Sequence, residues 1–187
     1  MWYNVANNKF CGGKMTQQTY NQQATQQLLD DYKKALDLLD DFDHQCLAKV
    51  EGQDCDYVLT YEECTKVIQQ MRFSSDSQLF GVEKDDSFKS TVATIYQTAG
   101  GQQLYPTWQQ KASHLLYFCT KNHSFVDGNK RIAATIFVYF LAKNNLLYKD
   151  GHKRISDQTL VALTVLIAQS NPQEKQLVTD LVQNLIN

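Results

Sequence analysis

Apolar residues recur every three or four positions along most of this chain, which is the spacing of amphipathic α-helices. The first such stretch runs from Leu28 to Phe42, with Asp and Lys between the apolar positions, and predicts a helix that ends near residue 43. Similar spacing, and start signals such as the Thr60-x-x-Glu63 capping box, predict further helices. They cover approximately residues 60–71, 87–96, 105–119, 132–141, 156–167 and 171–185.

The connections between these helices carry the turn residues. Residues 73–86 are rich in Ser, Asp and Gly and predict either a short β-hairpin or an irregular loop. The pair Gly100-Gly101 is expected to end the helix before it, and Lys149-Asp150-Gly151 predicts a small two-stranded turn. The fold class predicted is therefore all-α, with six or seven helices and a short β-hairpin.

Domain organisation follows from the change in composition near residue 28. Residues 16–27 are dominated by Gln, Asn and Thr and offer little to bury, so residues 1–27 are expected to be a partly disordered leader or the start of a fragment. Residues 28–187 are long enough to bury one sizeable core. We therefore expect a single domain from residue 28 to residue 187.

Charge, hydropathy and cysteine usage indicate the cellular location of the protein and the partners that it does not bind. The net charge of −2 argues against a strongly basic nucleic-acid footprint, and no apolar run approaches the length of a membrane span. The five cysteines form no C-x-x-C pair, which is typical of reduced thiols. These features predict a cytoplasmic protein with no membrane contact and no direct nucleic-acid binding.

One short segment, residues 123–131, gathers most of the reactive side chains and is called the polar loop. An imidazole can take up a proton near neutral pH, so His123 is a candidate general base; the alternative is a histidine with satisfied nitrogens at a helix end. Asp127 suits a hard cation such as Mg²⁺, or it caps the helix that follows. Phe125 is the apolar exception and is expected to point into the core and anchor the loop.

The second half of the polar loop is suited to an anion. Gly128 allows close backbone approach, and Asn129 can cap the helix or donate to a phosphate oxygen. Lys130 and Arg131 lie in the first helical turn, where the helix dipole disfavours cations. Because a bound anion would remove this misfit, the four residues together predict a phosphate site.

The sequence His-x-Phe-x-Asp-Gly-Asn-x-Arg, starting at His123, resembles the signature of the Fic/Doc family. This resemblance implies a Fic-type helical bundle that transfers AMP from ATP to a Ser, Thr or Tyr hydroxyl of a target protein, with Mg²⁺. It also implies roles: His123 deprotonates the hydroxyl, Asp127 holds Mg²⁺, Gly128 and Asn129 form the anion-binding turn, and Arg131 neutralises phosphate charge.

Two positions depart from the AMP-transferring pattern. Lys130 stands where that pattern has Gly, and Ala134 stands where it has a second Arg. The Asn-Lys-Arg run resembles the Doc branch, in which the nucleotide binds reversed and the terminal phosphate moves. AMP transfer and Doc-like phosphorylation therefore both stay open, as does a non-catalytic protein-binding module on the same scaffold.

The resemblance also assigns partners and regulation. Family members place a target-docking flap where this chain has residues 73–90, here called the flap segment. Many are inhibited by a Ser/Thr-x-x-x-Glu helix, which Ser170 and Glu174 match in part, or by an antitoxin or other inhibitor protein. The competing interpretation is an ordinary helix start, with Asn171 as N-cap, Pro172 at the first position and Glu174 closing a capping box.

Overall fold

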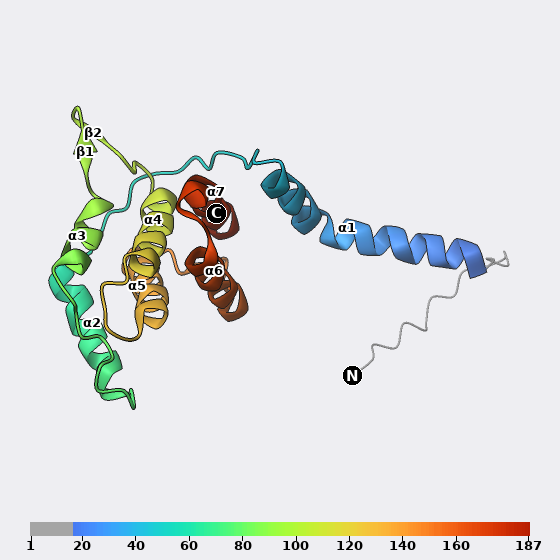
Figure 1. Cartoon of the computed structure of the whole chain (residues 1–187). Coiled ribbons are helices and arrows are strands. Elements are labelled where there is room, and N and C mark those ends of the chain that lie inside the picture. Colours follow the sequence, from blue (N-terminus) through green and yellow to red (C-terminus); the bar gives the residue numbers. More distant parts are fainter. Residues whose placement is uncertain (1–16) are drawn as a thin grey trace.

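The structure, a computed structural model, describes residues 17–187, with side chains from residue 22 onward. Within these residues the protein has seven α-helices, six of which pack together while the first lies apart, and two very small β-hairpins (Figure 1); this confirms the all-α prediction. The elements are α1 (Gln17–Asp43), α2 (Tyr61–Phe73), α3 (Ser87–Thr94), β1 (Thr98–Ala99), β2 (Gln102–Gln103), α4 (Trp108–Lys121), α5 (Asn129–Lys143), β3 (Tyr148–Lys149), β4 (His152–Lys153), α6 (Asp157–Gln169), a 3₁₀ turn (Pro172–Glu174) and α7 (Lys175–Ile186).

The centre of the bundle is α4. It packs against α3, α5, α6 and α7, and its buried residues lie on nearly every side of the helix. Thr107 and Gln110 form a reciprocal capping box at its start, so the sequence fixes where this helix begins. The next helix, α5, buries Ile132, Ile136 and Phe140 completely. Two buried helices therefore hold both ends of the polar loop.

The first helix stands apart from this core. Figure 1 shows α1 extending away from the body, joined to α2 by the connection of residues 44–60. It begins at residue 17, within the stretch expected to be a leader; residues 1–16 lie outside the described residues. Whether a domain boundary falls near residue 28 stays a prediction.

Two turn predictions have different outcomes. The Asp150-Gly151 turn joins β3 and β4, as predicted. The prediction that Gly100-Gly101 ends a helix is wrong, because α3 ends at Thr94 and the glycines form the turn of the β1–β2 hairpin. Both glycines have positive φ (57° and 79°), which is the backbone of a tight hairpin turn.

The described part of the chain has no candidate membrane span, and its cysteines are unpaired. No helix in residues 17–187 combines the length and the apolar character that crossing a bilayer requires. The four cysteines in this part are free thiols, and Cys11 lies outside the described residues. The cytoplasmic location stays a prediction.

A buried histidine on α4 makes stability depend on pH. The ring of His114 lies 4.1 Å from that of Tyr105 and donates through Nδ1 to the Gln110 carbonyl at 2.9 Å. Burial lowers the pKa of His114 to about 4 from its usual 6.5. The unfolded chain therefore binds more protons between pH 6.5 and pH 4, and the free energy of unfolding falls as pH falls through that window.

We expect His114→Phe to remove this dependence. Relative to the parent, the variant should lose about 2 kcal/mol less stability between pH 7 and pH 5, measured by urea unfolding at both values. His152→Phe, at an exposed position on β4, is the matched control for effects of the His-to-Phe substitution itself. Equal pH dependence in the parent and the His114 variant would contradict the assignment.

Candidate active site

The polar loop begins where α4 ends. Asn122 forms the C-cap of α4, and His123 follows with its side chain exposed. The backbone of His123 has φ of 49°, a left-handed conformation that is uncommon for residues other than glycine. Such strain persists only where the surroundings over-determine it. The structure thus gives the candidate base a fixed backbone and an imidazole open to solvent.

Phe125 and Asn129 close the loop from inside. The Phe125 side chain is 1% exposed, and its ring lies 4.9 Å from that of Phe88. The Asn129 side-chain amide spans the backbone of Phe125: Oδ1 accepts from its N–H at 2.9 Å and Nδ2 donates to its C=O at 2.7 Å. The Asn129 side chain is therefore engaged within the loop rather than offered to a ligand.

The flap segment holds the loop from outside. Between α2 and α3 it takes the irregular-loop alternative, with single β-bridges from Phe80 to Asp127 and from Glu83 to Phe125. Three backbone hydrogen bonds join the two segments. They are Gly81 N–H to Asp127 O (3.1 Å), Val126 N–H to Val82 O (2.9 Å) and Lys84 N–H to Ser124 O (2.9 Å).

The N-terminus of α5 is open towards solvent. Gly128 is its N-cap, with φ of 91°, and supplies no side-chain cap. The first bond of the helix runs from Ile132 N–H to Gly128 O at 2.9 Å. The N–H groups of Asn129, Lys130 and Arg131 precede it and have no intrahelical acceptor. With the exposed cations Lys130 and Arg131 beside them, they form a group suited to phosphate.

Gly128, not Asp127, is the N-cap of α5, so the Asp127 carboxylate is not used in capping this helix. It is 42% exposed and lies 3.6 Å from the Arg131 guanidinium, which also stacks 4.5 Å from the centre of the Phe80 ring. No group of three metal-binding side chains occurs in residues 17–187. A single carboxylate fits Mg²⁺ when nucleotide phosphates and water supply the other oxygens.

We expect Asp127→Asn to separate binding from stability. An exposed ion pair such as Asp127–Arg131 contributes roughly 0–1 kcal/mol, so thermal unfolding should hardly change. Loss of the carboxylate should raise the Mg²⁺ concentration needed for half-maximal transfer by about 10-fold or more. Lys33–Asp37 on α1 is a matched exposed i,i+4 pair, and Asp37→Asn should change neither quantity. An unchanged Mg²⁺ requirement would remove Asp127 from the metal site.

The two residues considered for inhibition lie at a helix end and a helix start: Ser170 is the C-cap of α6, and Glu174 belongs to the turn that follows. The Glu174 carboxylate accepts from the Asn171 N–H at 2.5 Å, and the two side chains make a capping box with Pro172 at the first position. The carbonyl of Ser170 accepts from Lys121 Nζ. Both residues thus have structural contacts here, and an inhibitory role for Ser170 and Glu174 stays a prediction.

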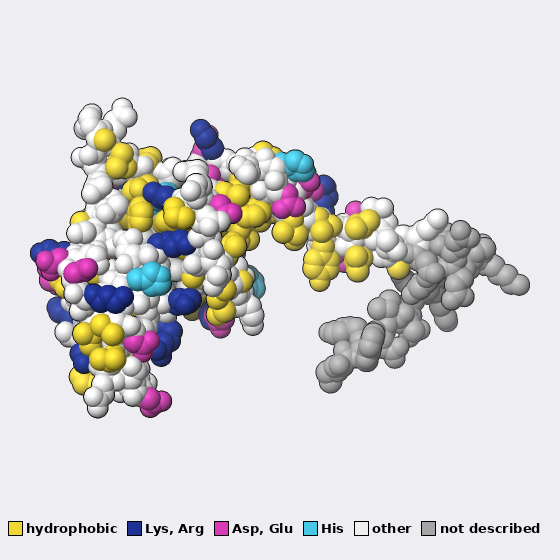
Figure 2. Space-filling view, viewed as in Figure 1, with side chains coloured by type: hydrophobic (Ala, Val, Ile, Leu, Met, Phe, Trp, Pro, Cys, Tyr) yellow, Lys and Arg dark blue, Asp and Glu magenta, His cyan; other side chains and the backbone are white. Residues whose placement is uncertain are grey.

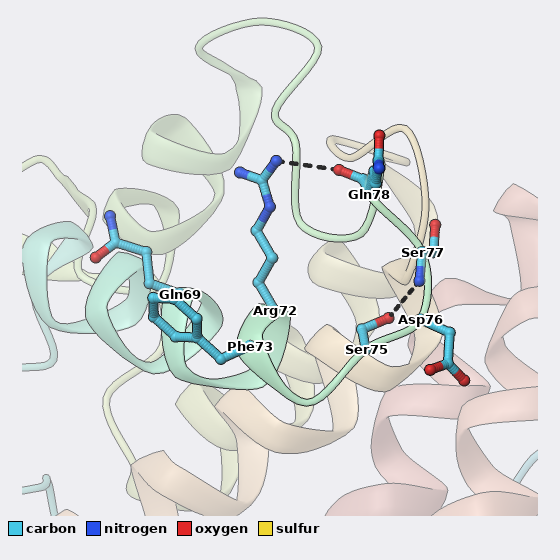
Figure 3. Close-up of a pocket in the computed structure, with 7 residues that line it drawn as sticks. All are labelled: Gln69, Arg72, Phe73, Ser75, Asp76, Ser77 and Gln78. Carbon is cyan, nitrogen blue, oxygen red and sulfur yellow. Dashed lines mark hydrogen bonds between the residues drawn. The ribbon is translucent and has the colours of Figure 1, made fainter.

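A pocket that the sequence did not suggest lies where α2 ends (Figure 3). Arg72 reaches across it and donates to the Gln78 carbonyl at 3.0 Å, and Ser77 N–H bonds to Ser75 Oγ at 3.3 Å. A second groove begins beside it, between α2 and Gly81–Glu83 of the flap segment. The residues of the flap segment that line them carry no periodic signal, so the hydrophobic pattern could not have located these two hollows. Their lining residues are Gln69, Arg72, Phe73, Ser75, Asp76, Ser77 and Gln78 for the first, and Tyr61, Thr65, Ile68, Gln69, Arg72, Gly81 and Glu83 for the second.

Comparison with protein families gives one match. Residues 58–141 match the model described as the Fic/DOC family, a segment that contains α2, α3, α4, the polar loop and most of α5. The match covers less than half of the 187-residue chain and points to this family over that segment, and the all-α architecture is consistent with a Fic-type fold. Comparison with curated proteins and with solved structures gave no match.

Proposed function

We propose that this protein is a transferase that moves AMP from ATP to a hydroxyl side chain of a target protein. The observation that carries the proposal is the open N-terminus of α5, where free N–H groups and Arg131 face solvent beside Asp127 and the preceding loop. This arrangement suits a nucleotide phosphate. His123, at the start of the polar loop, is exposed and has a left-handed backbone conformation.

In this mechanism His123 takes the proton from the target hydroxyl. The oxygen then forms a bond to the α-phosphorus of ATP, and the bond from that phosphorus to the pyrophosphate oxygen breaks. The N–H groups at the start of α5 and the Arg131 guanidinium stabilise the negative charge that builds on the phosphate oxygens. Asp127 would hold Mg²⁺, which supplies further neutralisation of the phosphates.

Doc-like phosphorylation is the second candidate, favoured by two positions. Lys130 adds an exposed cation at the α5 start, and Ala134 supplies no guanidinium one turn later. A nucleotide bound in the reverse direction would present its terminal phosphate to the hydroxyl activated by His123. The same base and the same anion site would then transfer a phosphoryl group and release a nucleoside diphosphate.

The target is proposed to dock along the flap segment. One edge of this segment is hydrogen-bonded to the polar loop. Its other side faces α2 across a groove. The Tyr61 hydroxyl on α2 donates to the Glu83 carboxylate across this groove at 2.9 Å. Leu79 and Val126 are exposed apolar residues on adjoining segments, since Phe80 and Asp127, which follow them, form a bridge. An extended target segment could add backbone hydrogen bonds there.

The test uses ATP labelled at the α-phosphate in one reaction and at the γ-phosphate in another. The protein is incubated with Mg²⁺ and a cell lysate, and labelled proteins are separated on a gel. AMP transfer predicts protein labelling from the α position alone. Labelling only from the γ position would replace it with phosphorylation, and labelling from neither would favour the protein-binding module.

A further inference from the structure

The first helix carries an apolar stripe that no other part of residues 17–187 covers. Leu29, Tyr32, Leu36 and Leu39 alternate at spacings of three and four, with Leu28 beside them, and each is between 44% and 63% exposed. Figure 2 shows apolar side chains along one side of α1, where it leaves the body. Positions at this spacing form one continuous face, as in helices that pack into a bundle.

An isolated helix of this kind lacks most of its expected stabilisation. Its side-chain pairs are surface contacts, such as Lys33 to Asp37 (2.9 Å) and Gln26 to Asp30 (3.0 Å), whereas most helical stability in proteins comes from packing an apolar face. A contiguous apolar patch of five residues on one helix face is typical of an interaction surface. We therefore expect another protein surface to bury this stripe.

A second uncovered apolar face lies on α6. Val161 and Val165 are 65% and 46% exposed, and Ala162 between them is exposed as well. The only charged residue of this helix is Asp157, at its start, and Lys153 pairs with it at 2.8 Å. The two faces approach each other at one point, where Phe42 from the end of α1 lines a groove with Leu166 of α6.

Charge favours α6 over a second α1 as the surface that receives α1. Residues 30–43 contain six Asp and two Lys, a balance of −4, so two α1 helices side by side would bring −8 together. The exposed face of α6 is uncharged between Val161 and Val165, and Lys121 lies at its far end, 3.4 Å from the Ala168 carbonyl. An acidic amphipathic helix therefore meets no like charge there.

Geometry favours the α6 of a second copy. In one chain, α1 leaves the groove at Phe42 and extends away from α6 (Figure 1). We propose that α1 of one chain packs its stripe on α6 of a second chain, and that the second α1 does the same in return. This arrangement closes about a two-fold axis and covers the exposed faces of both α1 helices and both α6 helices.

The first test is the mass of the full chain in solution by sedimentation equilibrium. The expected particle is a dimer of two 21.5 kDa chains at tens of micromolar. Leu36→Lys on α1 and Val161→Lys on α6 should each raise the dissociation constant of the dimer by at least about 10-fold. Asp30→Lys places the same side chain on the opposite side of α1 and should leave the dimer intact. A monomeric parent, or dissociation by the control alone, would overturn the proposal.

Disulfide trapping identifies which helices meet, even if a lysine variant folds poorly. In a Cys11→Ser, Cys46→Ser background, Leu36→Cys chains are mixed with Val161→Cys chains and oxidised. A cross-linked dimer that forms only in the mixture supports the α1–α6 contact. A dimer formed by Leu36→Cys alone would show α1 pairing with α1 and refute it. A chain carrying both cysteines that cross-links only within itself would show that α1 covers its own α6, which also refutes it.

Discussion

Replacement of His123 by alanine is expected to lower nucleotide-dependent labelling of the target by about 10²- to 10⁴-fold, the usual contribution of a positioned general base. The side chain is exposed, so its loss should leave the core intact and thermal unfolding close to that of the parent. Nucleotide binding should also persist, because the N–H groups of α5 and Arg131 are unchanged. The measurement is transfer of labelled nucleotide, with binding followed separately by calorimetry.

Two further variants make this test specific. His123→Asn removes the imidazole ring but tolerates the left-handed backbone at φ 49°, so this variant should be as inactive as the alanine variant and at least as stable. His152→Ala removes another exposed histidine, on β4, and should keep full activity. If His123→Ala and His123→Asn both label targets at the parent rate, the assignment of His123 as the general base fails.

The sequence anticipated the fold because most helices have one apolar face and readable ends. Thr60 starts α2 with the capping box that its spacing predicts, and α5 buries Ile132, Ile136 and Phe140 within the predicted helix. The same periodicity could not say what covers a face. Leu36 and Leu39 have the spacing of core residues, yet they are exposed, since covering a face depends on the tertiary or quaternary neighbour.

The candidate site was predictable in composition but not in its internal contacts. The cluster of charge and amide groups after His123 is visible in the sequence. That the Asn129 side chain bonds to Phe125 rather than to a ligand depends on how the loop folds back. The bonds between the flap segment and the polar loop join residues about 40 positions apart, and local pattern carries no information on such pairs. The Gly100-Gly101 error has the same origin: a helix end and a hairpin turn both favour glycine.

Gly128→Ala is expected to be the most damaging small change in the polar loop. Gly128 has φ of 91°, and a β-carbon at this position would lie 2.4 Å from Cε2 and 2.5 Å from Cδ2 of the Phe80 ring. Phe80 is 1% exposed and cannot move aside freely, so the loop must shift instead. We expect a loss of about 2–5 kcal/mol in the free energy of unfolding, from backbone strain and overpacking together. Transfer should fall by about 10²-fold, because displacement of the loop shifts the α5 N-terminus relative to His123 at the other end of the same loop.

Gly100→Ala separates the clash from the strain. Gly100 also has a positive φ, 57°, but a β-carbon there would meet nothing within 4 Å, at the tip of the β1–β2 hairpin. This control should lose only about 1–2 kcal/mol and keep its activity, since it carries the backbone cost alone. Urea unfolding and the labelling assay are run on both variants, and on Gly128→Ala combined with Phe80→Leu, whose smaller side chain makes room for the methyl group. In that combination the stability loss should be less than the sum of the two single losses. Equal losses for the two alanine variants, or simple additivity in the combination, would mean that contact with Phe80 does not set the position of the polar loop.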